Sequence, residues 1–232
     1  MKMWPCYLGW MLFELILRTQ YDNWLAWAVN ASWTFCWFLL FCHSMKDKTA
    51  WFPPRAVLAV LAWEIVLNIR YWTDSQGAVS YHNIHANIWP VITFLNLMMA
   101  WKYDPEKLAW PFPRRLLGLK VAGEFILFLS LILLTSLSLG ADHNNNWLLD
   151  AYLIPVLSLF FLIDLLRRSG HQFPPRIPHL LRIFGEVIWQ IFIWNLIREK
   201  GPLSIKIAVV MTLVLDAAFL AFLYFPRLIS GQ

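Results

Sequence analysis

Long runs of apolar residues alternate along this chain with short polar segments that are rich in charge or proline. A helix needs about 20 mostly apolar residues to cross the hydrocarbon core of a bilayer, and seven runs reach or approach that length. Backbone polar groups find no water in lipid, so each run is predicted to be an α-helix. The runs are residues 24–41, 55–72, 86–103, 116–139, 147–166, 179–197 and 203–225.

An eighth apolar segment, residues 4–17, is shorter and contains Glu14. It fits a true span, a tilted helix or a helix in the membrane interface, so the placement of residues 1–20 stays open. No small-residue cleavage site follows it, which argues against a cleaved signal peptide. We predict an all-α fold: a polytopic integral membrane bundle of seven transmembrane helices, or eight with the N-terminal helix, in one domain over residues 1–232.

The composition favours the same class. Hydrophobic residues make up 59% of the chain and charged residues 14%, whereas soluble domains carry about 25% charged residues. The net charge is +5, but the basic residues gather in particular loops. That distribution argues against a nucleic-acid partner and indicates membrane lipids as the surroundings of the chain.

Loop charges predict the orientation of the helices. Cytoplasmic loops of membrane proteins carry an excess of Lys and Arg. Three loops are basic, and they alternate with poorly charged loops at residues 72–87 and 140–146. We expect the basic loops in the cytoplasm, although the loop with Arg198 and Lys200 departs from the alternation. The basic residues are Lys46, Lys48 and Arg55, then Lys107, Arg114 and Arg115, then Arg167, Arg168 and Arg176.

Four carboxyl side chains interrupt the predicted spans at similar depth. Each lies nine to eleven residues from an arginine at the basic end of its helix. At 1.5 Å per residue this is roughly 13–17 Å, which is near the centre of a hydrocarbon core about 30 Å thick. The four are Glu64, Glu124, Glu186 and Asp216.

A carboxyl group at this depth is expected to be either protonated or paired. A protonated acid in a dry pocket is a potential proton donor. Asn68 lies one helical turn after Glu64 and is placed to hydrogen-bond it. Buried acids also join helices through hydrogen bonds, so a purely structural role stays open for each of the four.

Aromatic residues make up 17% of the chain. Some fit the aromatic belts at the two membrane surfaces, but others lie in the middle of predicted spans. Deep aromatic side chains mostly pack the core, yet desolvated aromatic faces also attract cations. A proton donor beside aromatic walls suits carbocation chemistry. The candidate pocket residues are Trp63, Trp89, Phe94, Trp189 and Trp194.

Motifs for other chemistry are not found in the sequence. It has no Asp-rich cluster of the DDxxD type to hold Mg²⁺ and diphosphate, no HExxH and no nucleotide-binding loop. His82 and His85 fall in a predicted outer loop, where we expect solvated loop or helix-start residues. The cysteines lack metal-binding spacing and are expected to be reduced. We therefore expect no cofactor and no metal.

Four segments together resemble the membrane-bound terpene cyclases of fungal meroterpenoid and indole diterpene pathways and their bacterial relatives. LAWEIVLNIRYW carries the WE pair of their second span as Trp63 and Glu64, and TLVLDAAFLAFLYF carries the aspartate of their last span as Asp216. LLRIFGEVIWQ is similar to the opening of their penultimate span, and WKYDPEKLAW to a linker between spans. The resemblance covers roughly residue 24 to the C-terminus.

The resemblance implies an enzyme that protonates a terminal epoxide or alkene of a linear prenyl chain. A carbocation cascade then closes rings and ends in loss of a proton. Glu64 and Asp216 match the essential acids of the family, one as the donor and the other as its partner, and the residues do not show which is which. Glu186 and Glu124 do not clearly belong to the family pattern; either could tune the donor or accept the final proton.

Two alternatives use the same residues. A proton-coupled transporter or channel would use the buried acids as a relay, and would need a polar path to both membrane faces. Another intramembrane enzyme or a scaffold subunit would use them for packing or for contacts with partners. The lack of an internal repeat disfavours a transporter.

Overall fold

The computed structural model describes residues 24–74, 81–109, 111–138, 146–168, 174–197 and 202–225. All regular structure within these residues is helical, and seven of the helices are 21 to 24 residues long. The elements are α2 (Trp24–Asp47), α3 (Pro54–Asp74), α4 (Tyr81–Tyr103), α5 (Pro105–Ala109), the 3-10 turn η1 (Arg114–Leu116), α6 (Leu117–Ser138), α7 (Asn146–Arg167), α8 (Arg176–Ile197) and α9 (Leu203–Tyr224).

The seven predicted runs coincide with the seven long helices, and the differences lie at their ends. α2 continues to Asp47 and α4 begins at Tyr81, so each contains polar residues that the apolar pattern left outside. His82 and His85 are therefore in the first turns of α4, so of the two expected positions, loop or helix start, the helix start is confirmed. Hydropathy marks the apolar stretch of a helix, whereas a helix can continue into polar sequence. Residues 4–17 lie outside the described residues.

Prolines mark several helix starts. Pro54 and Pro105 are the first residues of α3 and α5, and Pro202 caps α9. A proline fits there because the first amides of a helix have no partner within the helix, so a missing N–H loses no bond. These prolines thus mark where α3, α5 and α9 begin.

Three helical segments of the described residues are long and apolar enough to cross a membrane: Arg114–Ser138, Leu149–Arg167 and Leu203–Tyr224. Many large apolar side chains on α6 and α9 are exposed, such as Leu127, Leu134, Val210 and Val214. A surface of this kind suits contact with lipid rather than with water. The count of seven spans stays a prediction.

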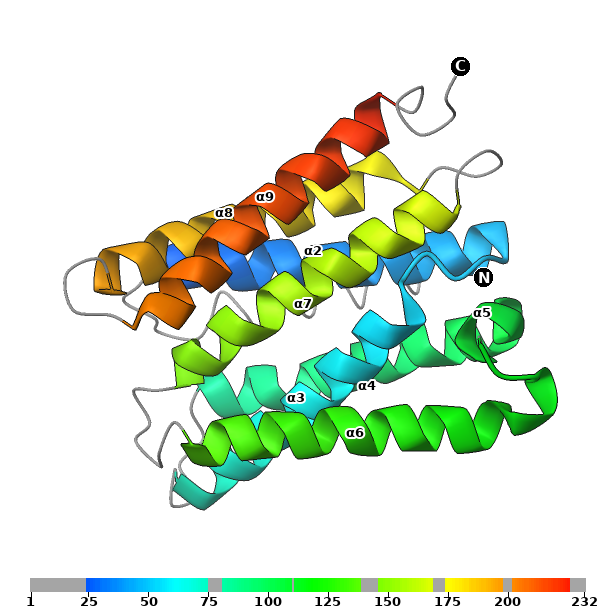
Figure 1. Cartoon of the computed structure of the whole chain (residues 1–232), viewed down its shortest axis with the longest axis horizontal. Helices are drawn as coiled ribbons and strands as arrows, with labels where there is room; N and C mark the ends of the chain where they lie inside the picture. The colour runs from blue at the N-terminus through cyan, green and yellow to red at the C-terminus, as the bar shows by residue number, and fades with distance from the viewer. Residues whose placement is uncertain are drawn as a thin grey trace.

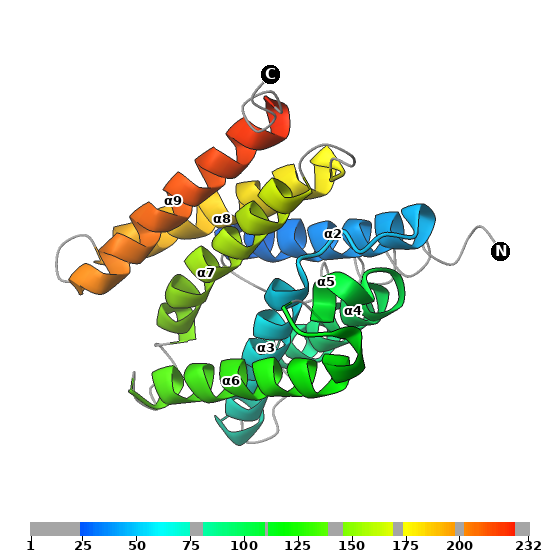
Figure 2. The ribbon, with the colours of Figure 1, turned by 45° about the vertical axis from the view of Figure 1, so that its right-hand side comes forward.

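The helices form two groups that meet at the core (Figure 1). α2 packs along α8 and α7 along α9, while α3 packs between α4 and α6 and also contacts α7. The turned view shows the same grouping, with α9 and α6 on opposite sides of the bundle (Figure 2). The largest buried cluster draws residues from both groups: Trp37, Phe161 and Phe219 come from α2, α7 and α9, and Val57 and Trp89 come from α3 and α4.

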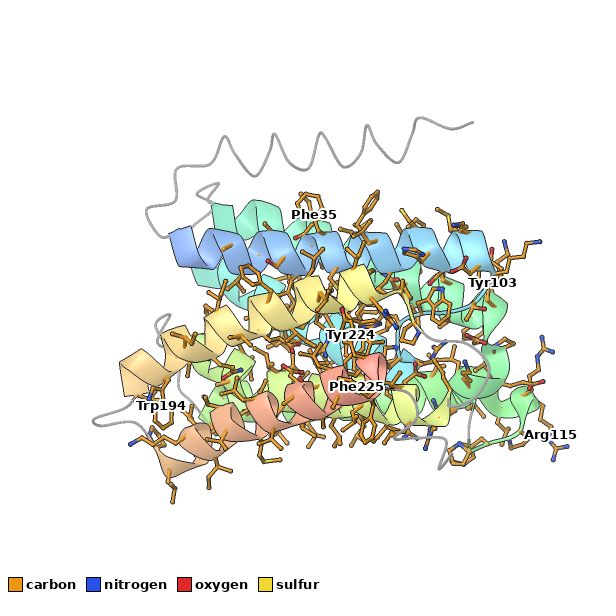
Figure 3. The ribbon with its side chains drawn as sticks, turned by 90° about the horizontal axis from the view of Figure 1, so that it is seen from above. Phe35, Tyr103, Arg115, Trp194, Tyr224 and Phe225 are labelled. Carbon is orange, nitrogen blue, oxygen red and sulfur yellow. The ribbon has the colours of Figure 1, made fainter. Side chains whose placement is uncertain are left out.

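The described basic loops meet at one end of the bundle, where Arg168 donates to the Ala50 carbonyl oxygen and the Ala50 N–H donates to Asp104. Tyr103 and Arg115 also lie at one end of the molecule, and Trp194 lies toward the other (Figure 3). Basic loops on one end are what the alternation of loop charges predicts. That this end faces the cytoplasm stays a prediction.

Candidate functional site

Glu64 lies in the middle of α3 and is buried. The Thr93 hydroxyl on α4 donates a hydrogen bond of 2.7 Å to its Oε1, and its Oε2 has no hydrogen-bond partner. Thr93 thus supplies the hydrogen bond that the sequence suggested for Asn68, which is half-buried one turn further along α3. Among the described residues no positively charged side chain pairs with Glu64, and its one hydrogen-bond donor there is the neutral Thr93 hydroxyl.

Indole rings extend from the neighbour of Glu64 across three helices. The ring centroids of Trp63 and Trp89 are 6.2 Å apart, and those of Trp89 and Trp33 are also 6.2 Å apart. The Trp89 Nε1 donates to the Thr34 hydroxyl at 3.0 Å, which fixes the ring between α4 and α2. Three indole rings are therefore held in series, from Trp63, which precedes Glu64 in α3, to Trp33 in α2.

Asp150 belongs to this group, although it is not among the candidate residues from the sequence. It lies in the first turns of α7 and accepts a hydrogen bond of 3.0 Å from the Trp63 Nε1. The bond fixes the indole that precedes Glu64 in the chain. The signal available in the sequence was weak, because an acid near a helix start is ordinary.

A second polar group joins α7, α8 and α9, and all of its members are buried. The Arg182 Nη1 lies 2.8 and 2.7 Å from the two carboxylate oxygens of Glu186 and 3.2 Å from the Asp216 Oδ1. The Ser158 hydroxyl on α7 is 3.3 Å from the Glu186 Oε2. Both acids interrupt apolar runs and can therefore be found from the sequence. Arg182 was given no role, although its position four residues before Glu186 allows the two side chains to pair on one helix face.

Aromatic rings surround the Arg182 guanidinium. Its Cζ lies 4.4 Å from the Phe161 ring centroid and 5.0 Å from the Phe219 ring centroid. The His179 ring packs against the same two phenylalanines. Cation–π contacts of this kind are strongest away from water, so the charge is stabilised by two acids and by two aromatic rings.

Close packing of α2 on α8 connects the two polar groups. A Cβ atom at Gly185 would lie 2.9 Å from the Trp33 Cδ1 and 3.2 Å from the Ser32 Cβ, so only glycine fits there without movement. The Trp33 ring, which neighbours Trp89, therefore also packs against the backbone directly before Glu186, and it stacks on Trp37 with the ring centroids 6.5 Å apart.

Glu64 and Asp216, the two acids singled out from the sequence, belong to different hydrogen-bonded groups. Glu64 bonds to Thr93 and Asp216 to Arg182, and the two carboxyls share no hydrogen bond or ion pair. This arrangement therefore does not support a mechanism in which the two carboxyls act as a directly hydrogen-bonded pair. The two acids instead lie in contrasting surroundings.

Glu124 departs from the predicted common depth. Its carboxylate pairs with the Arg55 Nε at 3.2 Å and with the Lys120 Nζ at 2.7 Å. Arg55 is the second residue of α3, whereas Glu64 is nine residues further on. Glu124 thus lies near the basic end of the bundle in an ion-pair cluster, since counting along α6 ignores how far that helix is shifted relative to α3.

The five aromatic residues predicted to line a pocket differ in burial, so they do not all line one buried site. Trp89 is buried, and Trp63 and Trp189 are partly buried against the core. Phe94 and Trp194 are 52% and 42% exposed, which places them on the outer surface. Among the described residues, no group of three His, Cys, Asp or Glu side chains could hold a metal ion.

A family model agrees with this arrangement. The model of the Pyr4-like transmembrane terpene cyclases matches residues 14–172, which is more than half of the chain. The matched segment contains Glu64, Thr93 and Asp150 and ends before α8 begins. Searches of curated proteins and of solved structures gave no match. The chain belongs to the family of Pyr4-like transmembrane terpene cyclases.

Proposed function

We propose that Glu64 is the general acid that starts cyclisation of a linear prenyl chain by protonating its terminal epoxide or alkene. The observation that supports this is the surroundings of Glu64: burial, one hydroxyl donor and no cation. A carboxylate without a countercharge is expensive in hydrocarbon. The neutral acid is the form that such a site favours, and a neutral acid can give a proton.

The reaction balances without an oxidant or a reductant. The Glu64 proton moves to the epoxide oxygen or to an alkene carbon, and the C–O bond or the alkene π bond breaks. Alkene π electrons of the same chain then form the new C–C bonds, and a final C–H bond gives up its proton as its electrons form an alkene. Product and substrate are isomers, and Glu64 regains its proton from water.

The aromatic series beside Glu64 supports the cationic stage. Trp63 precedes Glu64 in the chain, Trp89 lies one helical turn before Thr93, and their rings are fixed by the bonds to Asp150 and Thr34. An aromatic face stabilises a desolvated cation by about 2 kcal/mol. Fixed rings can also hold the chain in the folded shape that ring closure requires.

Asp216 has the complementary role in this proposal. Asp216 pairs with the Arg182 guanidinium, so in this proposal it balances positive charge rather than donating the first proton. One buried acid that is unpaired and one that is paired are a common way to separate an acid from a base. The lipid-like substrate would enter this metal-independent site from within a single bundle of seven spans.

The test uses membranes that contain the wild-type chain, Glu64→Gln or Glu106→Gln. Glu106 is an exposed acid on α5 and serves as the matched control. Farnesyl- and geranylgeranyl-bearing substrates, each with and without a terminal epoxide, are supplied, and cyclised products of equal mass are measured. We expect product from the wild type and from Glu106→Gln, and its loss in Glu64→Gln.

Two results would contradict the proposal. Equal product from Glu64→Gln and the wild type would exclude Glu64 as the donor. Proton flux into liposomes that contain the wild-type chain, with no product from any substrate, would favour the proton-coupled transporter instead.

A further inference from the structure

A line of polar side chains follows the buried face of α8. His179, Arg182, Glu186 and Gln190 are spaced by three, four and four residues, so they lie on one face of the helix, and all are buried. A buried ion pair seldom stabilises a fold more than apolar residues of the same size would. Packing alone therefore does not account for this line.

Among the described residues, the hydrogen bonds of the Arg182 guanidinium all involve one of its nitrogen atoms, Nη1. Four oxygens lie within 3.4 Å of Nη1: both Glu186 oxygens, the Asp216 Oδ1 and the Ser158 Oγ. Nη1 carries two hydrogens, so these acceptors compete for it. The Glu186 and Asp216 carboxylates are thus both hydrogen-bonded to Nη1 and share the positive charge of Arg182.

The charges of this group do not cancel when both acids are ionised. Two carboxylates and one guanidinium sum to one negative charge in a buried site. Uptake of one proton by the Glu186–Asp216 pair makes the group neutral, which low polarity favours. The other ionisable side chains around Arg182 are Cys36 on α2 and His179 on α8, and Ser158 faces it from α7.

We propose that Arg182 is a positioning residue that makes the Glu186–Asp216 pair the acceptor of the proton released at the end of cyclisation. The pair takes the proton of a C–H bond next to the cationic carbon, and the electrons of that bond form the product alkene. The proton later leaves to water. This inference rests on the proposed function and adds the group that closes the reaction.

The position of the pair fits this role. The indole rings of Trp63, Trp89 and Trp33 lie in series, and Trp33 packs against Gly185, which precedes Glu186. These aromatic rings therefore lie between α3, which carries Glu64, and α8, which carries Glu186. A cation formed during cyclisation would have aromatic faces on the way toward the anionic group.

Arg182→Lys tests the inference because lysine keeps the charge but lacks the planar fork that reaches several acceptors. We expect turnover to fall roughly 10- to 100-fold with KM nearly unchanged, as when a group that acts after binding is displaced. We also expect a changed ratio of product alkenes, or a water-quenched alcohol, because the base no longer lies where the proton is lost. A merely structural role would lower the amount of folded enzyme and leave the product ratio alone.

Arg168→Lys is the matched control. Arg168 also pairs with an acid, Asp164, and lies over an aromatic ring, Trp51, but at the basic end of the bundle. We expect its product ratio to equal that of the wild type, with thermal unfolding in detergent confirming the fold of each variant. If Arg182→Lys does not fold, Ser158→Ala replaces it, since it removes the hydroxyl beside Glu186 and leaves every charge in place.

The outcomes separate the two proposals. Wild-type turnover and product ratio in Arg182→Lys, or an unchanged ratio in Ser158→Ala, would overturn the role of Arg182 while leaving Glu64 as the donor. Loss of product in Glu64→Gln together with an altered ratio in Arg182→Lys would support both. No product from the wild type with any substrate would overturn both.

Discussion

Two buried acids of this chain have opposite surroundings, and the contrast suggests their division of labour. Glu64, in the group of α3 and α4, meets one hydroxyl and no cation. Asp216, in the group of α7, α8 and α9, meets a guanidinium that it shares with Glu186. Depth in the membrane does not decide what a carboxyl can do; the group nearest to it does.

The two regions also differ in what connects them to known proteins. The family match includes all of α3, α4 and α7, and ends at residue 172. The argument for Glu64 therefore draws on family membership and on geometry together. The argument for Arg182, Glu186 and Asp216 draws on geometry, because α8 and α9 lie beyond the matched segment.

The largest expected effect on the rate of cyclisation comes from replacing the buried glutamate of each region, in turn, with glutamine. Glu64→Gln should lower the rate of cyclisation by about 10²–10⁴-fold, the usual contribution of a general acid. Glu186→Gln should lower it by roughly tenfold, because Asp216 and Arg182 still hold a carboxylate in place. The measurement is product per minute per amount of folded protein, in membranes with saturating substrate.

Neither change should unfold the protein, since glutamine keeps the size of the side chain and an oxygen that accepts the Thr93 or Ser158 hydrogen bond. Equal losses in the two variants would remove the distinction between an initiating and a terminating acid.

The next largest effect is expected on the free energy of unfolding, when the close contact between α2 and α8 is disturbed. Gly185→Ala places a Cβ against Trp33 and should force α2 and α8 apart. Overpacking of a filled site costs about 1–3 kcal/mol, which thermal unfolding in detergent would detect. Gly123→Ala on α6, where no atom lies within 4 Å of the new Cβ, is the control. A variant Gly185→Ala as stable as the control would mean that the α2–α8 contact is looser than described.

The sequence predicted the helices well because membrane spans are encoded by local composition. A run of apolar residues must be helical in lipid whatever it packs against, so the seven runs match α2, α3, α4, α6, α7, α8 and α9. The short α5 and the polar ends of α2 and α4 were missed, because they lie where the apolar pattern stops.

The site was harder to predict because it depends on how helices are shifted against each other. Glu124 looked equivalent to Glu64 when residues were counted from the nearest arginine, yet it pairs with Arg55 at the end of α3. Arg182 and Asp150 were missed for the same reason: an arginine near a helix start and an acid near another acquire meaning only from a neighbouring helix. The helical periodicity of each segment shows which residues share a face, but it does not show which residues of another helix they contact.

A smaller effect tests whether Thr93 supports the Glu64 region. Thr93→Val removes the hydroxyl and keeps the shape of the side chain, so Glu64 loses its one hydrogen bond. A neutral hydrogen bond contributes about 1 kcal/mol, and we expect a roughly 3- to 10-fold loss of cyclisation rate without a change in the product ratio. Thr135→Val on α6, where the hydroxyl bonds only to its own helix, is the control. A changed product ratio in Thr93→Val would show that the two regions do not act at separate stages.

The smallest effect is expected from aromatic residues that share a helix with the site but face outward. Phe94 follows Thr93 in α4, yet its side chain is 52% exposed, whereas the Trp89 ring is buried against Trp33 and Trp63. Phe94→Leu keeps an apolar surface for lipid, so stability should change by less than about 0.5 kcal/mol and the rate by less than about twofold. Trp89→Leu removes the middle ring of the indole series and should reduce both cyclisation and stability, by about 2–4 kcal/mol for the latter. Rates and unfolding temperatures of the two variants, measured side by side, distinguish a wall of the site from a lipid-facing residue. A large loss of rate in Phe94→Leu would place the substrate on the outer face of α4 and move the site away from the buried indoles.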